Sequence, residues 1–160
     1  MHPTYEAATH VLRATLGDLT QLLDDLPAEA ADWRPFAEAN SLAVLVRHGL
    51  TATRFLSATA AGLEPDRAAY MANDRAEAFA ASGTTPEVLR GEIAAALPEI
   101  EAALARGSDA ALTAQASWAL GGSTRFPSGA ELLIHAMGHL KEHTGQAGLL
   151  RDLWKAGVGR

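Results

Sequence analysis

The segment from Ser128 to Trp154, SGAELLIHAMGHLKEHTGQAGLLRDLW, carries the most informative pattern in the chain. Ser128 followed by Glu131 has the spacing of a capping box, in which two residues at a helix start bond each other's backbone N–H groups. Leucine and alanine then recur at intervals of three and four residues, as one face of an α-helix requires. The pattern predicts a helix from Gly129 to about Trp154, which carries three of the six histidines.

Three further segments have the same helical spacing. They cover residues 4–26, 41–61 and 85–105. Between the second and third of them, residues 63–83 are expected to form a long connection in which DRAEAFAAS (74–82) makes a short helical piece. No segment alternates polar and apolar residues over the length of a strand. We therefore predict an all-α four-helix bundle, with residues 1–160 forming a single domain.

Composition excludes several classes of protein. The chain has 19 acidic and 13 basic residues, a formal net charge of −6, whereas nucleic-acid binding depends on basic residues that contact phosphates. No apolar run is long enough to cross a bilayer, and the first residues lack the pattern of a secretory signal. The absence of cysteine excludes disulfides and favours the cytoplasm. We expect a cytoplasmic protein that binds neither nucleic acid nor membrane.

The three histidines of the last helix are not equivalent. With His139 at zero on a helical wheel, His143 lies near roughly +40°, His135 near roughly −40° and the apolar centre near roughly +60°. His139 and His143 therefore face the core, and His135 lies at its flank. His135 and His143 are also about 12 Å apart along the helix, too far to share an ion that binds nitrogen at about 2.0–2.1 Å.

His139 and His143, one turn apart, can chelate one cation if a third ligand comes from elsewhere. His48 is the best candidate because it shares an apolar stripe with Leu45 and Ala52 of the second helix. A cation would satisfy imidazoles that are otherwise costly to bury among alanines and leucines. The alternative is a set of core histidines with ordinary hydrogen bonds. That is the default for His48 alone, but the three residues together favour metal binding.

The segment HLKEH (139–143) also matches the H-x-x-E-H signature of inverted zinc proteases, in which Glu142 would be the general base. That class needs a further carboxylate ligand well downstream. Only 17 residues follow His143, and Asp152 is the one acid among them. Glu142 also falls near roughly −60° on the wheel, away from the inward direction of the histidine pair. The protease interpretation is therefore disfavoured.

The sequence resembles the DinB-like (YfiT-like) superfamily of four-helix-bundle proteins over nearly its whole length. Members have a histidine in the second helix and an H-x-x-x-H pair in the last, often preceded by another histidine and followed by Gly-Gln. The matching residues are His48, His135, His139, His143, Gly145 and Gln146. Thr144 departs from the pattern, because many members have arginine there.

The resemblance implies a divalent ion, zinc or nickel, bound by His48, His139 and His143 with at least one position open to water or substrate. Relatives include mycothiol-dependent maleylpyruvate isomerase and bacillithiol transferases. The resemblance therefore implies a transferase or isomerase that uses a low-molecular-weight thiol. Because the chain has no cysteine, this thiol would arrive as a cosubstrate beside a small-molecule substrate. Related bundles also commonly form homodimers.

Two alternatives stay open. One is a non-catalytic, stress-related bundle that binds a metal or a small ligand, and the other is a helical dimer whose histidine cluster holds no ion. No catalytic side chain is predicted. His135 and Gln146 are expected beside the metal ligands, where the Gln146 amide either orients a histidine ring or bonds to the first helix or a neighbouring chain.

The remaining polar and aromatic candidates have ordinary interpretations. Arg47, Arg54 and Arg125 are interpreted as solvated surface groups and not as a substrate-binding set. His10 is expected on an exposed helical face. Trp118 is expected to be a core or interface residue that could also line the mouth of a pocket.

Overall fold

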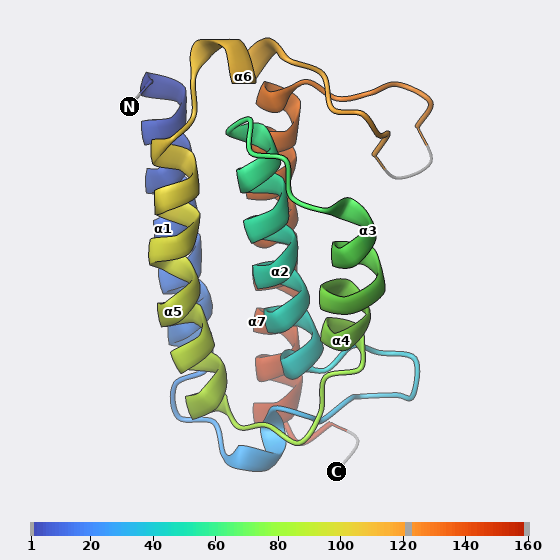
Figure 1. Cartoon of the computed structure of the whole chain (residues 1–160). Helices are drawn as coiled ribbons and strands as arrows, with labels where there is room; N and C mark the ends of the chain where they lie inside the picture. Colours follow the sequence, from blue (N-terminus) through green and yellow to red (C-terminus); the bar gives the residue numbers. More distant parts are fainter. Residues whose placement is uncertain (1, 121–122, 159–160) are drawn as a thin grey trace.

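The structure, a computed structural model, describes residues 2–120 and 123–158. Its body is formed by four long helices, α1 (Pro3–Leu22), α2 (Leu42–Ala60), α5 (Pro86–Ala105) and α7 (Gly129–Lys155). Figure 1 shows α1 and α7 running in one direction and α2 and α5 in the other. α1 and α2 each pack against both α5 and α7. The predicted all-α four-helix bundle is confirmed.

Each long helix begins where an N-cap side chain accepts a hydrogen bond from a backbone N–H of the first turn. The caps are His2, Ser41, Thr85 and Ser128. In α7 the Glu131 carboxylate also accepts a hydrogen bond from Ser128 N–H at 2.8 Å. This completes the capping box, and the predicted start at Gly129 is confirmed.

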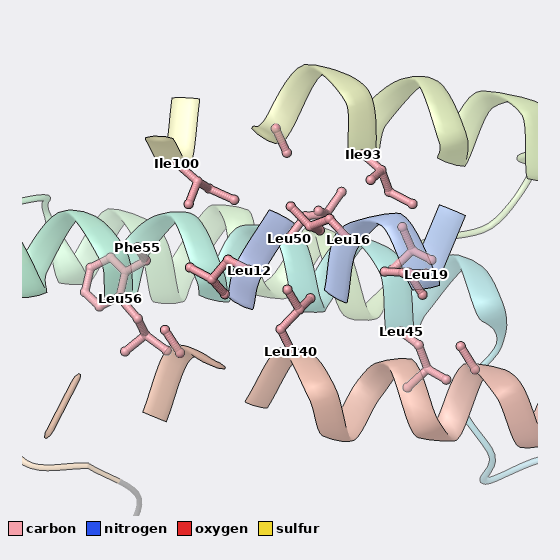
Figure 2. Close-up of a cluster of buried hydrophobic side chains, with 14 of the residues drawn as sticks. Leu12, Leu16, Leu19, Leu45, Leu50, Phe55, Leu56, Ile93, Ile100 and Leu140 are labelled. Carbon is pink, nitrogen blue, oxygen red and sulfur yellow. The ribbon is translucent and has the colours of Figure 1, made fainter. Parts of the chain in front are cut away.

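One apolar core lies between the four long helices. Figure 2 shows side chains from all of them directed into the same interior, including Leu12 of α1, Leu50 of α2, Ile100 of α5 and Leu140 of α7. All four are buried. Burying a side chain of this kind stabilises the fold by about 1.5–3 kcal/mol. The apolar stripes of the sequence therefore account for the assembly of the helices.

The connection between α2 and α5 is more helical than the sequence indicates. α3 (Arg67–Ala69), the π-helical turn η2 (Tyr70–Asp74) and α4 (Arg75–Phe79) follow one another directly, and this segment lies beside α2 (Figure 1). The predicted helical piece over 74–82 was therefore too short. The Asp66 side chain explains the earlier start, because it accepts a hydrogen bond from Ala69 N–H and caps the first turn.

The end of the first helix also differs from the prediction. α1 ends at Leu22, not near Leu26. Leu23 N–H bonds to the Thr20 carbonyl, three residues back, and Asp25 has a φ of 58°. An α-helix cannot continue through a residue of positive φ. A short 3₁₀ helix, η1 (Ala28–Ala30), follows in the loop toward α2.

The connection between α5 and α7 contains a short helix, α6 (Asp109–Thr113). The Ser108 hydroxyl caps it by accepting a hydrogen bond from Ala111 N–H. The segment that follows forms no further helix over its described residues, and Gly121 and Gly122 lie outside them. Across residues 2–120 and 123–158, no helix has both the length and the apolar character that crossing a membrane requires.

Candidate metal centre

His48 of α2 meets His139 and His143 of α7 where the two helices pack; His48 is buried and the other two are half-buried. One possible ligand atom from each residue lies within 4.8 Å of those of the other two. The Nε2 atoms of His139 and His143 are 3.1 Å apart. The ring centre of His48 lies 4.9 Å from that of His139 and 5.0 Å from that of His143. The structure thus brings together the three residues that the sequence selects.

Local packing turns these rings inward. Leu45 and Ala52 lie on the same face of α2 as His48, one turn before and one turn after it. Leu140 directly follows His139 in the sequence of α7. All three of these apolar side chains are buried. Phe79 of α4 covers the remaining side of His48, with ring centres 4.4 Å apart. His48 is consequently only 8% exposed. The segment between α2 and α5 therefore helps to enclose the cluster.

The pKa of His48 is lowered from 6.5 to about 4 and that of His139 from 6.5 to about 3, chiefly by burial. The proximity of His143 and of Arg75 contributes to both of these shifts. A charged ring loses hydration in this environment and meets like charges nearby. His48 and His139 are therefore neutral at pH 7, and each keeps a nitrogen lone pair that can bind a cation.

The hydrogen bonds of His143 fix which of its nitrogens faces the cluster. Its Nδ1 lies 3.0 Å from Gln146 Oε1. Because an amide oxygen only accepts, Nδ1 must carry the hydrogen, and the Nε2 lone pair points toward His139 Nε2. Two nitrogens at about 2.0–2.1 Å from one tetrahedral ion would be about 3.3 Å apart. The observed 3.1 Å separation is close to that value.

Two other nitrogens of the cluster lack partners. Nδ1 of His48 and Nδ1 of His139 are buried and have no hydrogen-bond partner among the described residues. Buried polar atoms of this kind indicate a missing ligand or water. Because an imidazole binds one ion through a single nitrogen, and Nε2 of His139 faces the cluster, only the His48 atom bears on the ion. Three imidazoles form a donor set that suits zinc, nickel or copper, whereas magnesium and calcium prefer oxygen ligands. The residues present therefore fit a divalent transition-metal ion.

The structure places the neighbouring polar residues outside this trio. The ring of His135 is exposed and its centre lies 5.9 Å from that of His139, as the flank position predicts. Gln146 contacts His143 directly, with Oε1 3.0 Å from Nδ1, which is the contact that the ring-orienting alternative requires. Gln146 Nε2 donates to the exposed Glu142 carboxylate at 3.3 Å. Glu142 thus supports Gln146 from the solvent side.

The geometry gives the protease interpretation no support. Glu142 is exposed on α7 and is bonded to Gln146. Asp152, the one carboxylate after His143, is also exposed and lies about 20 Å along the helix from His139. It cannot complete a site with the histidine pair.

A pocket of about 450 Å³ adjoins the cluster, and His48, His135 and His139 form part of its wall. Trp118 also lines it, as the sequence suggested. The rest of the wall includes residues that sequence reasoning missed. These are Phe55, Arg67, Tyr70, Met71 and Arg75. Most of these five residues belong to the connection between α2 and α5. The sequence pattern does not predict which part of the bundle such a connection packs against.

The three arginines interpreted as surface groups are held in ion pairs. Arg47 pairs with Glu92 and Arg54 with Glu99. Arg125 pairs with Glu131 at the start of α7. None of the three lines the pocket beside the histidines.

An antiparallel pair of helices within a four-helix bundle, with three inward histidines beside a pocket, defines a class of candidate metal-binding bundles. The chain belongs to the DinB superfamily, because the model of that superfamily matches residues 12–147. A crystal structure described as the conserved protein of a locus from Enterococcus faecalis is similar to it. The two structures align with a TM-score of 0.69 and 18% sequence identity, and the alignment covers 96% of this chain and 97% of the other. This similarity shows a shared fold. A search of curated proteins finds no match.

Proposed function

We propose that the protein is a divalent-metal-dependent transferase or isomerase that acts on a small molecule with a low-molecular-weight thiol as cosubstrate. The observation that carries the proposal is the trio His48, His139 and His143, of which His48 and His139 line a pocket of about 450 Å³. Three protein ligands next to open space are typical of catalytic metal sites, whereas structural sites are closed by four. Membership of the DinB superfamily adds support through the resemblance of the histidine pattern.

The roles of the chain's own residues follow from their positions. His48, His139 and His143 would hold zinc or nickel, and Gln146 keeps the His143 ring in the orientation that directs Nε2 inward. Such an ion supplies positive charge that lowers the pKa of a thiol or a water beside it. Phe79 excludes water from His48, and His135 offers an imidazole nitrogen in the pocket wall that can accept a proton.

The reaction class is the one that the family resemblance implies, and because the chain has no cysteine, its thiol would arrive as a cosubstrate. The thiol proton leaves for solvent or for His135, and the sulfur electron pair forms a bond to an electrophilic carbon of the substrate. In a transfer, a leaving group departs with the electron pair of its bond to that carbon. In an isomerisation, the sulfur adds to one carbon of a C=C bond and the π electron pair moves to an adjoining carbonyl group. The resulting single bond rotates, and the returning electron pair re-forms the C=C bond as the thiolate leaves.

The first experiment tests metal binding. The protein is purified without a histidine tag and its metal content is measured by mass spectrometry. We expect about one zinc or nickel ion per chain, as a three-imidazole site implies, and its loss in His139→Ala. His10→Ala is the matched control, since His10 is exposed on α1. Absence of metal from the unaltered protein would contradict the proposal.

The second experiment tests catalysis in the metal-loaded protein. Consumption of bacillithiol, mycothiol and glutathione is followed against a panel of electrophiles. We expect turnover with at least one thiol and its loss in His139→Ala. If no thiol supports turnover while the metal is present, the alternative of a non-catalytic metal- or ligand-binding bundle is favoured.

The homodimer and the cytoplasmic location stay predictions. Light scattering on the purified protein measures the first, and imaging of a tagged chain in its host tests the second.

A further inference from the structure

We infer that the pocket beside the histidine cluster binds the carboxylate of a small organic anion whose body is apolar or aromatic. This inference rests on the proposed function only in assigning the anion as its substrate. The residues that carry it, Arg67, Arg75, Tyr70, Phe55 and Trp118, are distinct from the three candidate metal ligands.

The first observation is the charge of the pocket wall. Arg67 and Arg75 both line it, and none of the other described residues of the wall is an aspartate or glutamate. The chain as a whole is acidic, with 19 acidic and 13 basic residues. The pocket wall, with two guanidinium groups and no carboxylate, is therefore positively charged although the chain as a whole is negatively charged. Its field favours an anion over a neutral or cationic ligand.

The second observation is that these two guanidinium groups lack carboxylate partners. Neither Arg67 nor Arg75 has an ion pair with any residue that the structure describes, whereas Arg47 and Arg54, on the neighbouring surface of α2, both do. The nearby Asp66 carboxylate is used as the cap of α3. The hydrogen-bond donors of both pocket arginines are thus available to a ligand, and guanidinium matches a carboxylate in a two-pronged geometry.

The third observation is that aromatic rings hold the two guanidinium groups. Arg67 lies over the Trp118 ring at 5.1 Å, and Arg75 lies over the Phe79 ring at 4.7 Å. These contacts orient the charges without neutralising them. Phe79 in turn packs on His48, so the Arg75 charge is held next to the metal centre, where it also lowers the pKa of His48 and His139.

The rest of the pocket wall suits the apolar body of such an anion. Phe55 and Tyr70 stack with ring centres 4.3 Å apart and an interplanar angle of 10°, and Phe55 also contacts Trp118 at 5.6 Å. Tyr70 begins the π-helical turn η2, a feature frequent at functional sites. A volume of about 450 Å³ is within the usual range for small-molecule sites. The carboxylate would face the arginines and the body would contact the rings.

The experiment compares 2-naphthoate with its neutral counterpart 2-naphthamide by calorimetry and by tryptophan fluorescence, on metal-free protein. We expect the acid to bind at least about tenfold more tightly than the amide, because charged hydrogen bonds to guanidinium contribute about 1.5–3 kcal/mol. Added salt should weaken the binding of the acid only. No saturable binding of naphthoate up to roughly 10 mM, or equal binding of acid and amide, would overturn the inference.

Variants assign the effect to the pocket. The double variant R67Q/R75Q should lose the preference for the acid, and R67K/R75K should keep part of it. The matched control is R34Q/R106Q, which removes the same charge from two exposed positions outside the pocket. An equal loss in the control would overturn the inference. All variants are first shown to unfold at the same denaturant concentration as the parent.

Two further arms separate this inference from the metal proposal. His143→Ala should keep the preference for naphthoate although it loses the ion, because His143 does not line the pocket. If the protein holds no metal but still prefers the acid through Arg67 and Arg75, the proposed function fails and the anion site stands. If metal is bound and R67Q/R75Q prefers the acid as strongly as the parent does, the inference fails and the metal centre stands.

Discussion

At the scale of single residues, Gln146 has the clearest supporting role in the candidate metal centre. Its amide oxygen accepts from His143 Nδ1, and its amide nitrogen donates to Glu142. The first bond selects the tautomer of His143, and the second holds the amide in that orientation. Groups that hold metal ligands in this way commonly change metal affinity by about 10–100-fold when removed.

We therefore predict that Gln146→Leu weakens binding of zinc or nickel by about tenfold, the lower end of that range because Gln146 is exposed. Competition with a chromophoric chelator measures the affinity. Gln146→Glu should retain tight binding, because its carboxylate still accepts from Nδ1. Gln21→Leu makes the same change at an exposed position of α1 and should have no effect. Unchanged affinity in Gln146→Leu would show that the amide does not support the ligand.

At the scale of elements, the start of α7 is held by a close contact with α6. A Cβ atom added at Gly129 would lie 2.1 Å from the Ala111 carbonyl oxygen and 3.0 Å from that of Ala60. The first turn of α7 can approach α6 and the end of α2 this closely only because residue 129 is glycine. Gly91 of α5 is different, because an added Cβ there meets nothing within 4 Å.

The two glycines should therefore respond in opposite ways to alanine. Gly91→Ala is expected to stabilise the protein by about 0.5–1 kcal/mol, because alanine restricts the unfolded chain and favours helix. Gly129→Ala is expected to destabilise it by about 1–3 kcal/mol through overpacking against backbone atoms. Urea denaturation gives both values. A stabilising Gly129→Ala would mean that α6 can move away from α7 at little cost.

At the scale of the whole molecule, the histidine cluster joins parts that are distant in the chain. His48 of α2 and the pair on α7 are separated by more than ninety positions, and α4 covers His48 through Phe79. A ligand held by all three histidines would bind only the folded chain. It would therefore stabilise the fold by linkage.

We predict that zinc or nickel at about 100 times its Kd raises the free energy of unfolding by about 2.7 kcal/mol, and that a chelator reverses the gain. Denaturation with and without metal measures the difference. His48→Ala should unfold at the same denaturant concentration in both conditions, and His10→Ala should respond like the parent. The same metal-dependent gain in His48→Ala would place the ion elsewhere.

Much of this architecture is local in origin and was predictable. The caps Ser41, Thr85 and Ser128 and the apolar spacing locate the long helices, because both signals act within one or two turns. The orientation of the last-helix histidines was predictable for the same reason. The end of α1 was not, because Asp25 takes a positive φ that no residue type demands. The early start of α3 at Arg67 had only a weak signal, the single cap Asp66 before a short segment with two alanines.

The sequence by itself determined the helices, their buried faces and the inward direction of His139 and His143, since each depends on neighbours a few residues away. Only the tertiary structure decided that His48 meets this pair and that Phe79 covers His48. It also decided that Arg67 and Arg75 reach the adjoining pocket. These placements depend on how the segment between α2 and α5 folds back over the bundle. Packing between distant elements sets the path of this segment, and the hydrophobic periodicity within one helix does not predict it.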